Sequence, residues 1–478
     1  MRGILSFGTY LPHRRLDRST IAAVAGTGGG KGTRTVASYD EDTTTLGVEA
    51  ARRALRAAPA GAAPGALWFA TVAPAYLDKT NATAIHAALR LPADVIAADF
   101  GGAIRSGVAA LRAALAGGPA ALVVTSDIRT GLPGSADEAA GGDAAAAVLV
   151  GDDADGPLLA EVIGSGTATD EFLDRWRTPG DARSKQWEEK FGETRYVPLA
   201  QAAFAAALAD AGIDADRVDH LVVAGPHARA AKAAVRKLGV PGDRLVDDLA
   251  GTVGNPGAAQ LGLLLAATLE AATPGQVIAL VSLADGADVV LLRTTDALAG
   301  FASAPTVADQ AAGGAPLPYG KFLAWRGMLT PEPPRRPEPA RPSASAAGRS
   351  EDWKFGFVGS QDHESGAIHL PPSRVSMVGG AVDDMEPIPM ADVAGTVATY
   401  TIDKLVYSPS PPVVFAIVDF DGGGRAPVEL TDVDPADVAI GTRIEMTFRR
   451  FFTADGIHNY FWKGRPLPGP AAPIAEEA

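Results

Sequence analysis

The chain turns at Asp99-Phe100-Gly101-Gly102-Ala103-Ile104-Arg105-Ser106-Gly107, where two adjacent glycines lead into a helical pattern. A Gly-rich turn at the start of a helix is a typical place for an enzyme to expose a nucleophilic side chain. The position that would carry the nucleophile holds Ile104, and none of the 478 residues is a cysteine. This stretch therefore predicts an α/β fold that has kept an active-site turn and lost the group that reacts.

The sequence around this turn alternates short apolar strands with longer helical patterns, which indicates α/β layering. The elements of the first copy are helix 44–57, strand 67–72, helix 81–89, the Gly-rich turn, helix 106–116 and strand 121–125, with a further strand at 145–150. The same order returns as helix 199–211, strand 221–224, helix 228–238, Gly-rich turn 251–257, helix 258–271 and strand 277–281. Two copies of one supersecondary pattern predict a duplicated fold with pseudo-twofold symmetry and a central site.

The composition changes after residue 328. Residues 329–350 are rich in Pro, Ser, Ala and Gly, which predicts an extended linker. Beyond it, three alternating apolar segments at 395–402, 413–418 and 442–448 predict the strands of a small closed barrel of the OB type. The expected organisation is a first domain at 1–328, with halves of about 1–165 and 166–328, the linker at 329–350, and a second domain at 351–478.

Charge and hydropathy limit the classes of function. The formal net charge is -14, which argues against broad binding to nucleic acid or to anionic membranes. No apolar run reaches the roughly 18 residues that would span a bilayer, and the first residues are too short an apolar run for a signal peptide. We therefore expect a cytoplasmic enzyme or binding protein.

The motif Ser38-Tyr39-Asp40-Glu41-Asp42-Thr43, followed by Val48-Glu49-Ala50-Ala51-Arg52, resembles the 3-hydroxy-3-methylglutaryl-CoA synthase-like (ketoacyl synthase III-like) members of the thiolase superfamily. With the duplicated halves, the resemblance covers roughly residues 1–300. Residues from about 351 to 467 resemble the zinc-ribbon-plus-OB-fold proteins that accompany thiolase-like enzymes acting on acyl-CoA. The resemblance implies a duplicated thiolase-like fold of layered αβαβα form, followed by a small all-β OB barrel. It also implies a homodimer and an acyl-CoA thioester as ligand, with coenzyme A as part of the substrate and no separate cofactor.

The resemblance also places the catalytic positions of the family. Its cysteine falls at Ile104 and its glutamate at Val72, whereas its histidine falls at His227 and the asparagine of related synthases at Asn255. An isoleucine cannot form a thioester, but an imidazole and an amide suffice to move a proton or polarise a carbonyl. The resemblance thus implies aldol or retro-aldol chemistry, or decarboxylation, on a CoA thioester without an acyl-enzyme. In this reading His227 is the acid/base and Asn255 polarises the thioester carbonyl.

Other side chains near these positions have two readings each. Tyr76 and Lys79 are each either a replacement acid/base or a loop residue, and Lys79 is also a candidate substrate contact. Arg105 either meets a carboxylate or phosphate or stays solvated, and Lys185 either binds CoA phosphate or belongs to a solvated charged face. For His227 the alternative is a strand-end histidine with satisfied hydrogen bonds.

Two further pairs of readings concern turns and strand ends. For Asn255, which lies between glycines, the alternative to a ligand group is a left-handed turn. Asp127 and Arg129 follow the strand that begins at Ala121, and a surface ion pair is the expectation for them.

The second domain lacks the thiolates of a zinc ribbon. At the C-x2-C spacings the chain has Asp362, Ser365, Ser376 and Gly379. Neither serine nor glycine replaces a thiolate ligand, so the sequence predicts no metal there and a ribbon held by aromatic packing around Trp353.

Two rival functions remain at this point. The chain could be a catalytically silent acyl-CoA-binding scaffold or a partner subunit of an active thiolase-like enzyme. It could also be a synthase that has recruited another nucleophile, for which Ser106 is the candidate in a displaced turn.

Overall fold

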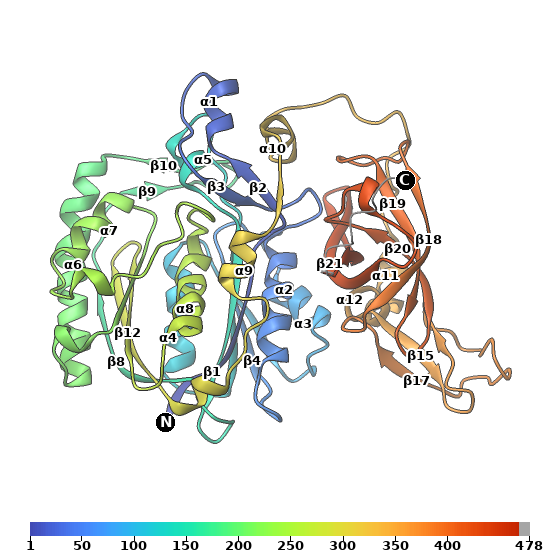
Figure 1. Cartoon of the computed structure of the whole chain (residues 1–478), viewed down its shortest axis with the longest axis horizontal. Helices are drawn as coiled ribbons and strands as arrows, with labels where there is room; N and C mark the ends of the chain where they lie inside the picture. The colour runs from blue at the N-terminus through green and yellow to red at the C-terminus, as the bar shows by residue number, and fades with distance from the viewer. Residues whose placement is uncertain (468–478) are drawn as a thin grey trace, which may run out of the picture. The chain divides into compact units, whose positions relative to one another are not determined.

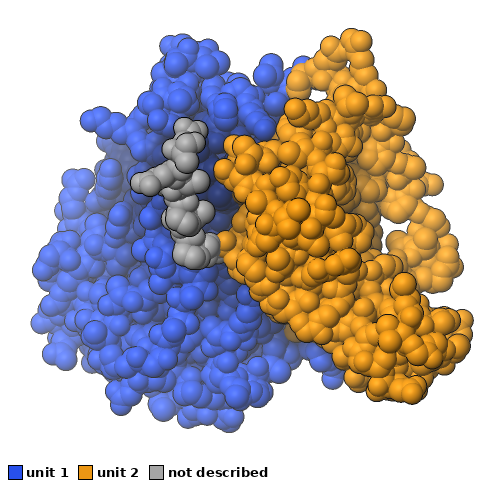
Figure 2. Space-filling view, turned by 45° about the vertical axis from the view of Figure 1, so that its right-hand side comes forward, with its two compact units in different colours: residues 1–38, 42–86, 92–330 blue, residues 39–41, 87–91, 331–478 orange. Residues whose placement is uncertain are grey.

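The computed structural model describes residues 1–467, which form the two compact units coloured in Figure 2. The first unit comprises residues 1–38, 42–86 and 92–330, and the second comprises 39–41, 87–91 and the chain from 331 onward. Residues 468–478 of the expected second domain lie outside the described residues. The segments 39–41 and 87–91 differ from the sequence expectation, which assigned them to the first domain.

The first unit contains a nine-stranded sheet whose order is β11-β12-β13-β8-β1-β7-β6-β4-β5. Its strands are β1 (Arg2–Tyr10), β4 (Ala66–Thr71), β5 (Ile96–Gly101), β6 (Ala121–Asp127), β7 (Ala144–Asp152), β8 (Ala160–Ala168), β11 (His220–Ala224), β12 (Val277–Leu283) and β13 (Ala287–Thr294). In one half β4 and β6 are parallel, and β6-β7 and β7-β1 are antiparallel. In the other half β11 and β12 are parallel, and β12-β13 and β13-β8 are antiparallel. The repeated order confirms the predicted duplication.

Helices complete the layers of this unit, as Figure 1 shows. They are α2 (Thr43–Arg56), α4 (Arg105–Leu115), α6 (Glu189–Ala211), α7 (Ala228–Val235) and α8 (Gln260–Ala271). Helix α3 (Ala82–Ala88) begins in the first unit, and its last two residues belong to the second. Helices α4 and α8 contact strands of both halves, whereas α2 packs on β1, β6 and β7 and α6 packs on β8 and β13. Helix α8 is buried along most of its length, as expected for a helix that is apolar on nearly all sides. The result is the αβαβα layering implied by the resemblance.

The halves differ at the sheet edges. Strand β5 pairs with β4 in the first half, but the equivalent edge of the second half has only a single parallel bridge between Leu221 and Leu245. Helix α6 begins at Glu189 instead of at residue 199, because the polar turns before Pro198 are also helical.

Shorter elements surround the layers. They are β2 (Arg14–Asp17), β3 (Thr33–Val36), β9 (Arg175–Trp176), β10 (Lys185–Gln186), β14 (Ala315–Pro316), α1 (Ser19–Ala25), α5 (Ala136–Ala140), α9 (Val307–Ala312) and α10 (Tyr319–Trp325). Across residues 1–467, none of the helices has the combination of length and apolar content that crossing a membrane requires.

The second unit contains the expected barrel, closed in the order β18-β19-β20-β22-β21. Its strands are β18 (Gly395–Asp403), β19 (Val413–Phe420), β20 (Arg425–Leu430), β21 (Arg443–Ala454) and β22 (Ile457–Pro466). A three-stranded sheet, β16-β15-β17, is formed by β15 (Val358–Asp362), β16 (Ile368–His369) and β17 (Met385–Pro389). The remaining helices are α11 (Ala344–Arg349) and α12 (Glu351–Gly356), so part of the expected linker is helical.

Candidate functional site

The turn that follows β5 places residue 104 at the first position before helix α4. Gly102 has φ +96°, and the Ser106 hydroxyl donates to the Gly101 carbonyl at 3.1 Å. Gly107 lets α4 approach the chain before α8 closely, since a Cβ there would lie 2.5 Å from the Ala258 carbonyl oxygen. The turn thus keeps its form because of its glycines and hydrogen bonds, neither of which depends on a thiol.

Ile104 lines a cavity of about 810 Å³ in the first unit. The wall also contains Val72, just after β4, so the two positions at which the resemblance places the family's cysteine and glutamate face the same space. Polar side chains of this cavity come from both halves and from the loops between them. They include Tyr76, Lys79, Arg129, Arg175, Arg177, Tyr196 and Asp285.

A second cavity of about 710 Å³ lies in the same unit. Asn255 and Gln260 contribute to its wall, together with the cationic side chains of Arg18, Lys232 and Arg236. The two cavities have Arg129, Arg175 and Pro226 in common among their lining residues. A long ligand could therefore extend from one into the other past these residues.

His227 caps helix α7 and is 4% exposed. Its Nδ1 accepts from the Ala230 backbone N–H at 3.0 Å, and its Nε2 donates to the Glu189 carbonyl at 2.8 Å. Both ring nitrogens therefore have partners within the protein, and His227 does not line either cavity. The acid/base role stays a prediction that this geometry does not favour, because the alternative of a satisfied strand-end histidine describes these contacts.

Asn255 lines the smaller cavity, but its amide also holds a turn together. Its Nδ2 donates to the Gly225 carbonyl at 2.8 Å, and its Oδ1 accepts from the Gly257 N–H at 2.9 Å. The flanking Gly254 and Gly257 have positive φ values, whereas Asn255 itself does not. The structure thus separates Asn255, in one cavity, from Ile104, in the other.

Arg105 is a structural cation, which differs from the predicted substrate contact. Its Nε pairs with Asp288 at 2.8 Å and its Nη1 donates to the Asp285 carbonyl at 2.7 Å. Its Nη2 donates to the Thr169 hydroxyl at 2.9 Å. These contacts join the start of α4 to β13 and leave Arg105 outside the cavity wall.

The other predicted side chains lie near the larger cavity. Tyr76 and Lys79 belong to its wall, and the Lys79 ammonium donates to the Thr83 hydroxyl at 2.9 Å. Lys185, in β10, is half exposed, forms a 3.8 Å ion pair with Asp181 and is absent from both walls. Asp181 does line the larger cavity, so Lys185 lies one contact away from it.

Asp127 and Arg129 are not a surface pair, contrary to the sequence expectation. Asp127 is fully buried and accepts three hydrogen bonds, from the Thr71 hydroxyl at 3.0 Å and from the backbone N–H groups of Val72 at 2.8 Å and Ala258 at 2.7 Å. Burial raises the pKa of Asp127. Apolar residues on both faces of β6 bury the end of this strand. The positions of Asp127 and Arg129 in the sequence do not reveal this burial.

Two further residues escaped the sequence reasoning. Asp285 lies in the turn between β12 and β13, and its N–H donates to the Tyr196 hydroxyl at 3.2 Å. Partial burial raises the pKa of Asp285, and burial also raises the pKa of Tyr196. Both side chains line the larger cavity with Ile104. The only sequence signal was a lone aspartate after a buried strand, in a turn that is also common for structural reasons.

The zinc-ribbon positions of the second unit are joined by hydrogen bonds. The Ser365 hydroxyl donates to the Asp362 carboxylate at 2.6 Å, and His369 Nε2 lies 3.3 Å from the Ser376 hydroxyl. Hydrogen bonds from Ser365 and Ser376 hold the pKa of Asp362 well below its usual range. In the described part of the chain, no group of three or more His, Asp or Glu side chains is placed to hold a metal ion. A carboxylate already bound by hydroxyls, with glycine at the fourth position, does not fit the tetrahedral zinc of a ribbon.

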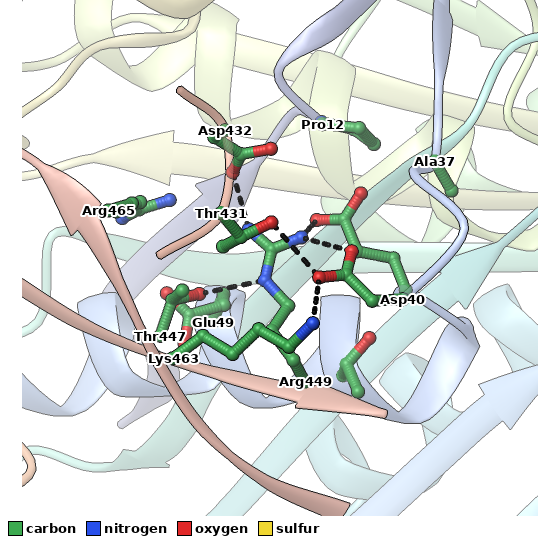
Figure 3. A network of polar contacts seen from close by, with 12 residues as sticks. Pro12, Ala37, Asp40, Glu49, Thr431, Asp432, Thr447, Arg449, Lys463 and Arg465 are labelled. Atoms are coloured by element: carbon green, nitrogen blue, oxygen red, sulfur yellow. Dashed lines mark hydrogen bonds and ion pairs between the residues drawn. The ribbon is translucent and has the colours of Figure 1, made fainter. Parts of the chain in front are cut away.

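Figure 3 shows a buried ion network of the second unit, which involves the segment 39–41. Lys463 Nζ lies 3.0 Å from Asp40, and Arg449 contacts Glu41 at 2.5 Å and Asp432 at 2.6 Å. Although burial opposes its ionisation, Lys463 and Arg449 lower the pKa of Asp40 to about 2. Removing one partner of such a network typically costs about 3–5 kcal/mol. We therefore assign these charges to the stability of the second unit and not to a ligand.

Two family models match parts of the chain. Residues 208–291 match the C-terminal part of 3-oxoacyl-[acyl-carrier-protein] synthase III, and residues 388–449 match the C-terminal OB-fold domain of ChsH2. Solved structures with a similar fold include PksG, an HMG-CoA synthase from Bacillus subtilis (TM-score 0.58, 20% identity, covering 68% of this chain and 89% of that one). The synthase III of Pseudomonas aeruginosa is another (TM-score 0.54, 24% identity, covering 62% and 98%).

Curated relatives give the family. The hydroxymethylglutaryl-CoA synthase of Pyrococcus horikoshii is 30% identical over 295 residues, which are 60% of this chain and 83% of the relative. That of Archaeoglobus fulgidus is 29% identical over 347 residues, which are 69% of this chain and 99% of the relative. The chain therefore belongs to the hydroxymethylglutaryl-CoA synthase family of thiolase-like proteins, and it carries in addition a C-terminal OB-fold domain of the ChsH2 type.

Proposed function

We propose that this protein binds an acyl-CoA thioester in the first unit and makes or breaks a carbon–carbon bond in it by aldol or retro-aldol chemistry, without an acyl-enzyme. One observation carries the proposal. The larger cavity contains both Ile104 and Val72 in place of the family's reactive groups, yet it also holds a carboxyl group and a phenol, those of Asp285 and Tyr196. In this proposal the site cannot form an acyl-enzyme, but the carboxyl group of Asp285 and the phenol of Tyr196 can transfer protons.

The two cavities suit the two parts of such a ligand. The smaller one is lined by Arg18, Lys232 and Arg236, cations that can meet the phosphates of coenzyme A, and by apolar side chains along which a pantetheine arm can lie. The larger one would then hold the acyl group. The thioester would pass the residues common to both walls, Arg129, Arg175 and Pro226.

In the cleavage direction, Asp285 is the base of the proposal. Its carboxylate takes the proton of the β-hydroxyl group, the Cα–Cβ bond breaks as the carbonyl product forms, and the electron pair moves into the thioester enolate. The enolate then takes at Cα the proton that Asp285 received, which returns Asp285 to its carboxylate form. A raised carboxyl pKa makes Asp285 a stronger base near neutral pH, and the Arg105 contact to its backbone carbonyl holds it beside the start of α4. There the positive end of the α4 dipole favours the developing negative charge.

The test is turnover of β-hydroxyacyl-CoA thioesters of several chain lengths, followed by mass spectrometry of the carbonyl and acyl-CoA products. We expect cleavage that Asp285→Asn lowers at least 100-fold, the usual range for a general base being about 10²–10⁴-fold. Asp181→Asn is the matched control, since Asp181 lines the same cavity but is bound by Thr178 and Lys185. Full activity in Asp285→Asn would exclude this assignment.

The rival reading of a silent acyl-CoA-binding scaffold gives a different result in the same experiment. It predicts binding of the thioesters with no product in the wild-type protein or in either variant. The apolar Ile104 and Val72 are the observation that favours it. Homodimer formation and cytoplasmic location remain predictions.

A further inference from the structure

Within residues 1–467, the phenol of Tyr196 accepts a hydrogen bond but donates none. The side chain is 1% exposed and lines the larger cavity. Its oxygen accepts from the Asp285 backbone N–H at 3.2 Å, and no oxygen atom of the described residues accepts its O–H. A buried hydroxyl group normally uses its donor as well as its acceptor. The unused donor therefore indicates an acceptor that a ligand in the cavity supplies.

Aromatic contacts fix the ring that carries this hydroxyl. Tyr196 lies in α6, and the Phe172 ring meets it edge-on with the ring centroids 5.0 Å apart. The His227 ring also meets it edge-on, with the centroids 6.1 Å apart. Edge-to-face contacts are a preferred arrangement of aromatic rings. The phenol is thus held in place in advance, which is what makes a donor effective when charge develops beside it.

The turn between β12 and β13 holds the N–H that meets the phenol. Asp285 has φ +50°, an uncommon conformation for a residue with a side chain. The Ala284 N–H donates to the Gly286 carbonyl at 3.2 Å, and Arg105 Nη1 donates to the Asp285 carbonyl at 2.7 Å. Backbone strain of this kind persists where the surroundings impose it, and it is frequent at active sites. The phenol oxygen is therefore fixed beside the residue that carries the proposed base.

Two other groups that could polarise a thioester carbonyl are engaged. Asn255 lines only the smaller cavity, and its amide is bound by Gly225 and Gly257. The Lys79 ammonium lines the larger cavity and donates to the Thr83 hydroxyl at 2.9 Å. The phenol, by contrast, needs to give up no contact within the protein in order to bind a carbonyl oxygen.

We propose that Tyr196 is a catalytic residue whose hydroxyl donates a hydrogen bond to the thioester carbonyl oxygen and stabilises the negative charge that this oxygen gains in the enolate. The inference rests on the proposed function, because it assigns a group to the enolate of that reaction. A preorganised donor at such an oxygen acts mainly in the transition state, where the charge is larger than in the bound substrate.

The electron and proton movements of the proposed cleavage remain balanced. The electron pair of the breaking Cα–Cβ bond forms a double bond to Cα, and the carbonyl pair moves onto the oxygen that faces Tyr196. Tyr196 keeps its proton, and burial favours this because it raises the pKa of the phenol. Only Cα separates the carbonyl carbon from the carbon that carries the β-hydroxyl group. One ligand can therefore contact Tyr196 and the Asp285 carboxylate together.

Infrared spectroscopy of a bound thioester tests this hydrogen bond without turnover. Propanoyl-CoA with an isotopically labelled carbonyl carbon cannot be cleaved, since it has no β-hydroxyl group. We expect its carbonyl band at a lower frequency on the full-length wild-type protein than on Tyr196→Phe, because a hydrogen bond weakens the C=O bond. A ring-fluorinated tyrosine at residue 196 is a stronger donor and should lower the frequency further. Tyr319→Phe, which removes a buried phenol outside both cavity walls, is the matched control and should leave the band unchanged.

Turnover measures the catalytic size of the effect. With β-hydroxyacyl-CoA substrates, Tyr196→Phe should lower kcat by about 10²–10³-fold and change KM by less than about threefold, as expected for the loss of one oxyanion donor. Tyr319→Phe should keep the wild-type kcat, because its hydroxyl donates to Glu138 away from the cavities.

The outcomes separate this inference from the proposed function. Equal carbonyl frequencies on the wild-type protein and Tyr196→Phe would overturn the inference, as would a band that shifts only in Arg129→Gln. If the band depends on Tyr196 but no β-hydroxyacyl-CoA is cleaved, the hydrogen bond stands and the carbon–carbon chemistry fails. If propanoyl-CoA does not bind, both are wrong. Where Tyr196→Phe melts at a lower temperature, the fluorinated protein decides, and a band equal to that of the wild type overturns the inference.

Discussion

The turn at 99–107 and the ribbon at 359–379 both lack the cysteines that the resemblance places there, and the structures of the two stretches differ. At the turn, Ile104 lines a cavity of the first unit. At the ribbon, Asp362, Ser365 and Ser376 bind one another. A catalytic thiol makes few contacts that hold the fold, whereas a structural metal is itself the cross-link of a small ribbon. The fold can therefore tolerate the loss of a nucleophile without new contacts, whereas the loss of a structural metal requires new contacts in its place.

The largest expected effect comes from restoring the metal site. A variant with cysteine at Asp362, Ser365, Ser376 and Gly379 should bind one Zn²⁺ with an apparent free energy of about 10–16 kcal/mol at pH 7, the range of structural zinc peptides. Gly379 has φ +81°, so cysteine there adds backbone strain that zinc binding must exceed. Competition against a chromogenic chelator measures the affinity.

The control for this graft leaves Gly379 in place, and it should bind zinc far more weakly because one thiolate is missing. Absence of zinc binding by the full graft would show that the four positions do not form a ribbon knuckle. The wild-type protein should have the same melting temperature with and without a chelator.

The second prediction concerns Asp127, which holds together the chain segments behind the wall of the larger cavity. Asp127→Ala removes three hydrogen bonds and the carboxylate nearest Arg129, so the free energy of unfolding should fall by about 3–5 kcal/mol. Denaturant unfolding measures it, with Asp181→Ala as a partly exposed control that should change stability by less than about 1 kcal/mol. A similar loss in both variants would contradict the assignment of Asp127 as the residue that joins β4 to the start of α8.

A smaller loss of stability is expected in the ribbon. Ser376→Ala removes a buried hydroxyl that contacts Asp362 and His369, and the free energy of unfolding measured in denaturant should fall by about 1–2 kcal/mol.

The stability of the ribbon should also depend on pH. Since hydrogen bonds lower the pKa of Asp362 in the folded state, this carboxylate stabilises the protein above its unfolded pKa of roughly 4. That contribution is lost as the pH falls through the lower folded value.

Melting curves from pH 7 to pH 2 follow this loss in the wild-type protein. Asp362→Asn cannot ionise, so its melting temperature should be lower at neutral pH and should approach the wild-type value in acid. If the difference between the two proteins stays constant over this pH range, ionised Asp362 does not stabilise the ribbon.

The sequence predicted the layers better than the site. Periodicity located β4, β6, β7, β11 and β12 of the large sheet within a few residues, because each buries one face or both. It missed the other four strands of that sheet, β1, β5, β8 and β13, and it began α6 ten residues late. It also placed Asp127 at the surface, because strand position says nothing about what covers a strand end. The roles of His227 and Arg105 depend on hydrogen bonds to residues far away in the sequence, Glu189 and Asp288, and a motif cannot reveal that those groups are already occupied.

The last prediction tests whether a cysteine at residue 104 is enough to give the turn a synthase reaction. Ile104→Cys should alter stability by about 1 kcal/mol or less, because the side chain borders a cavity. The start of α4 should lower the thiol pKa, so iodoacetamide should label this cysteine faster than it labels the exposed Ser345→Cys control. Yet acetyl-CoA and acetoacetyl-CoA should give no condensation product, since Val72 supplies no acid and both nitrogens of His227 have partners. Turnover by Ile104→Cys would mean that His227 breaks its hydrogen bonds to Glu189 and Ala230 and acts on the thiol. The missing cysteine would then be the one difference that keeps this chain from acting as a synthase.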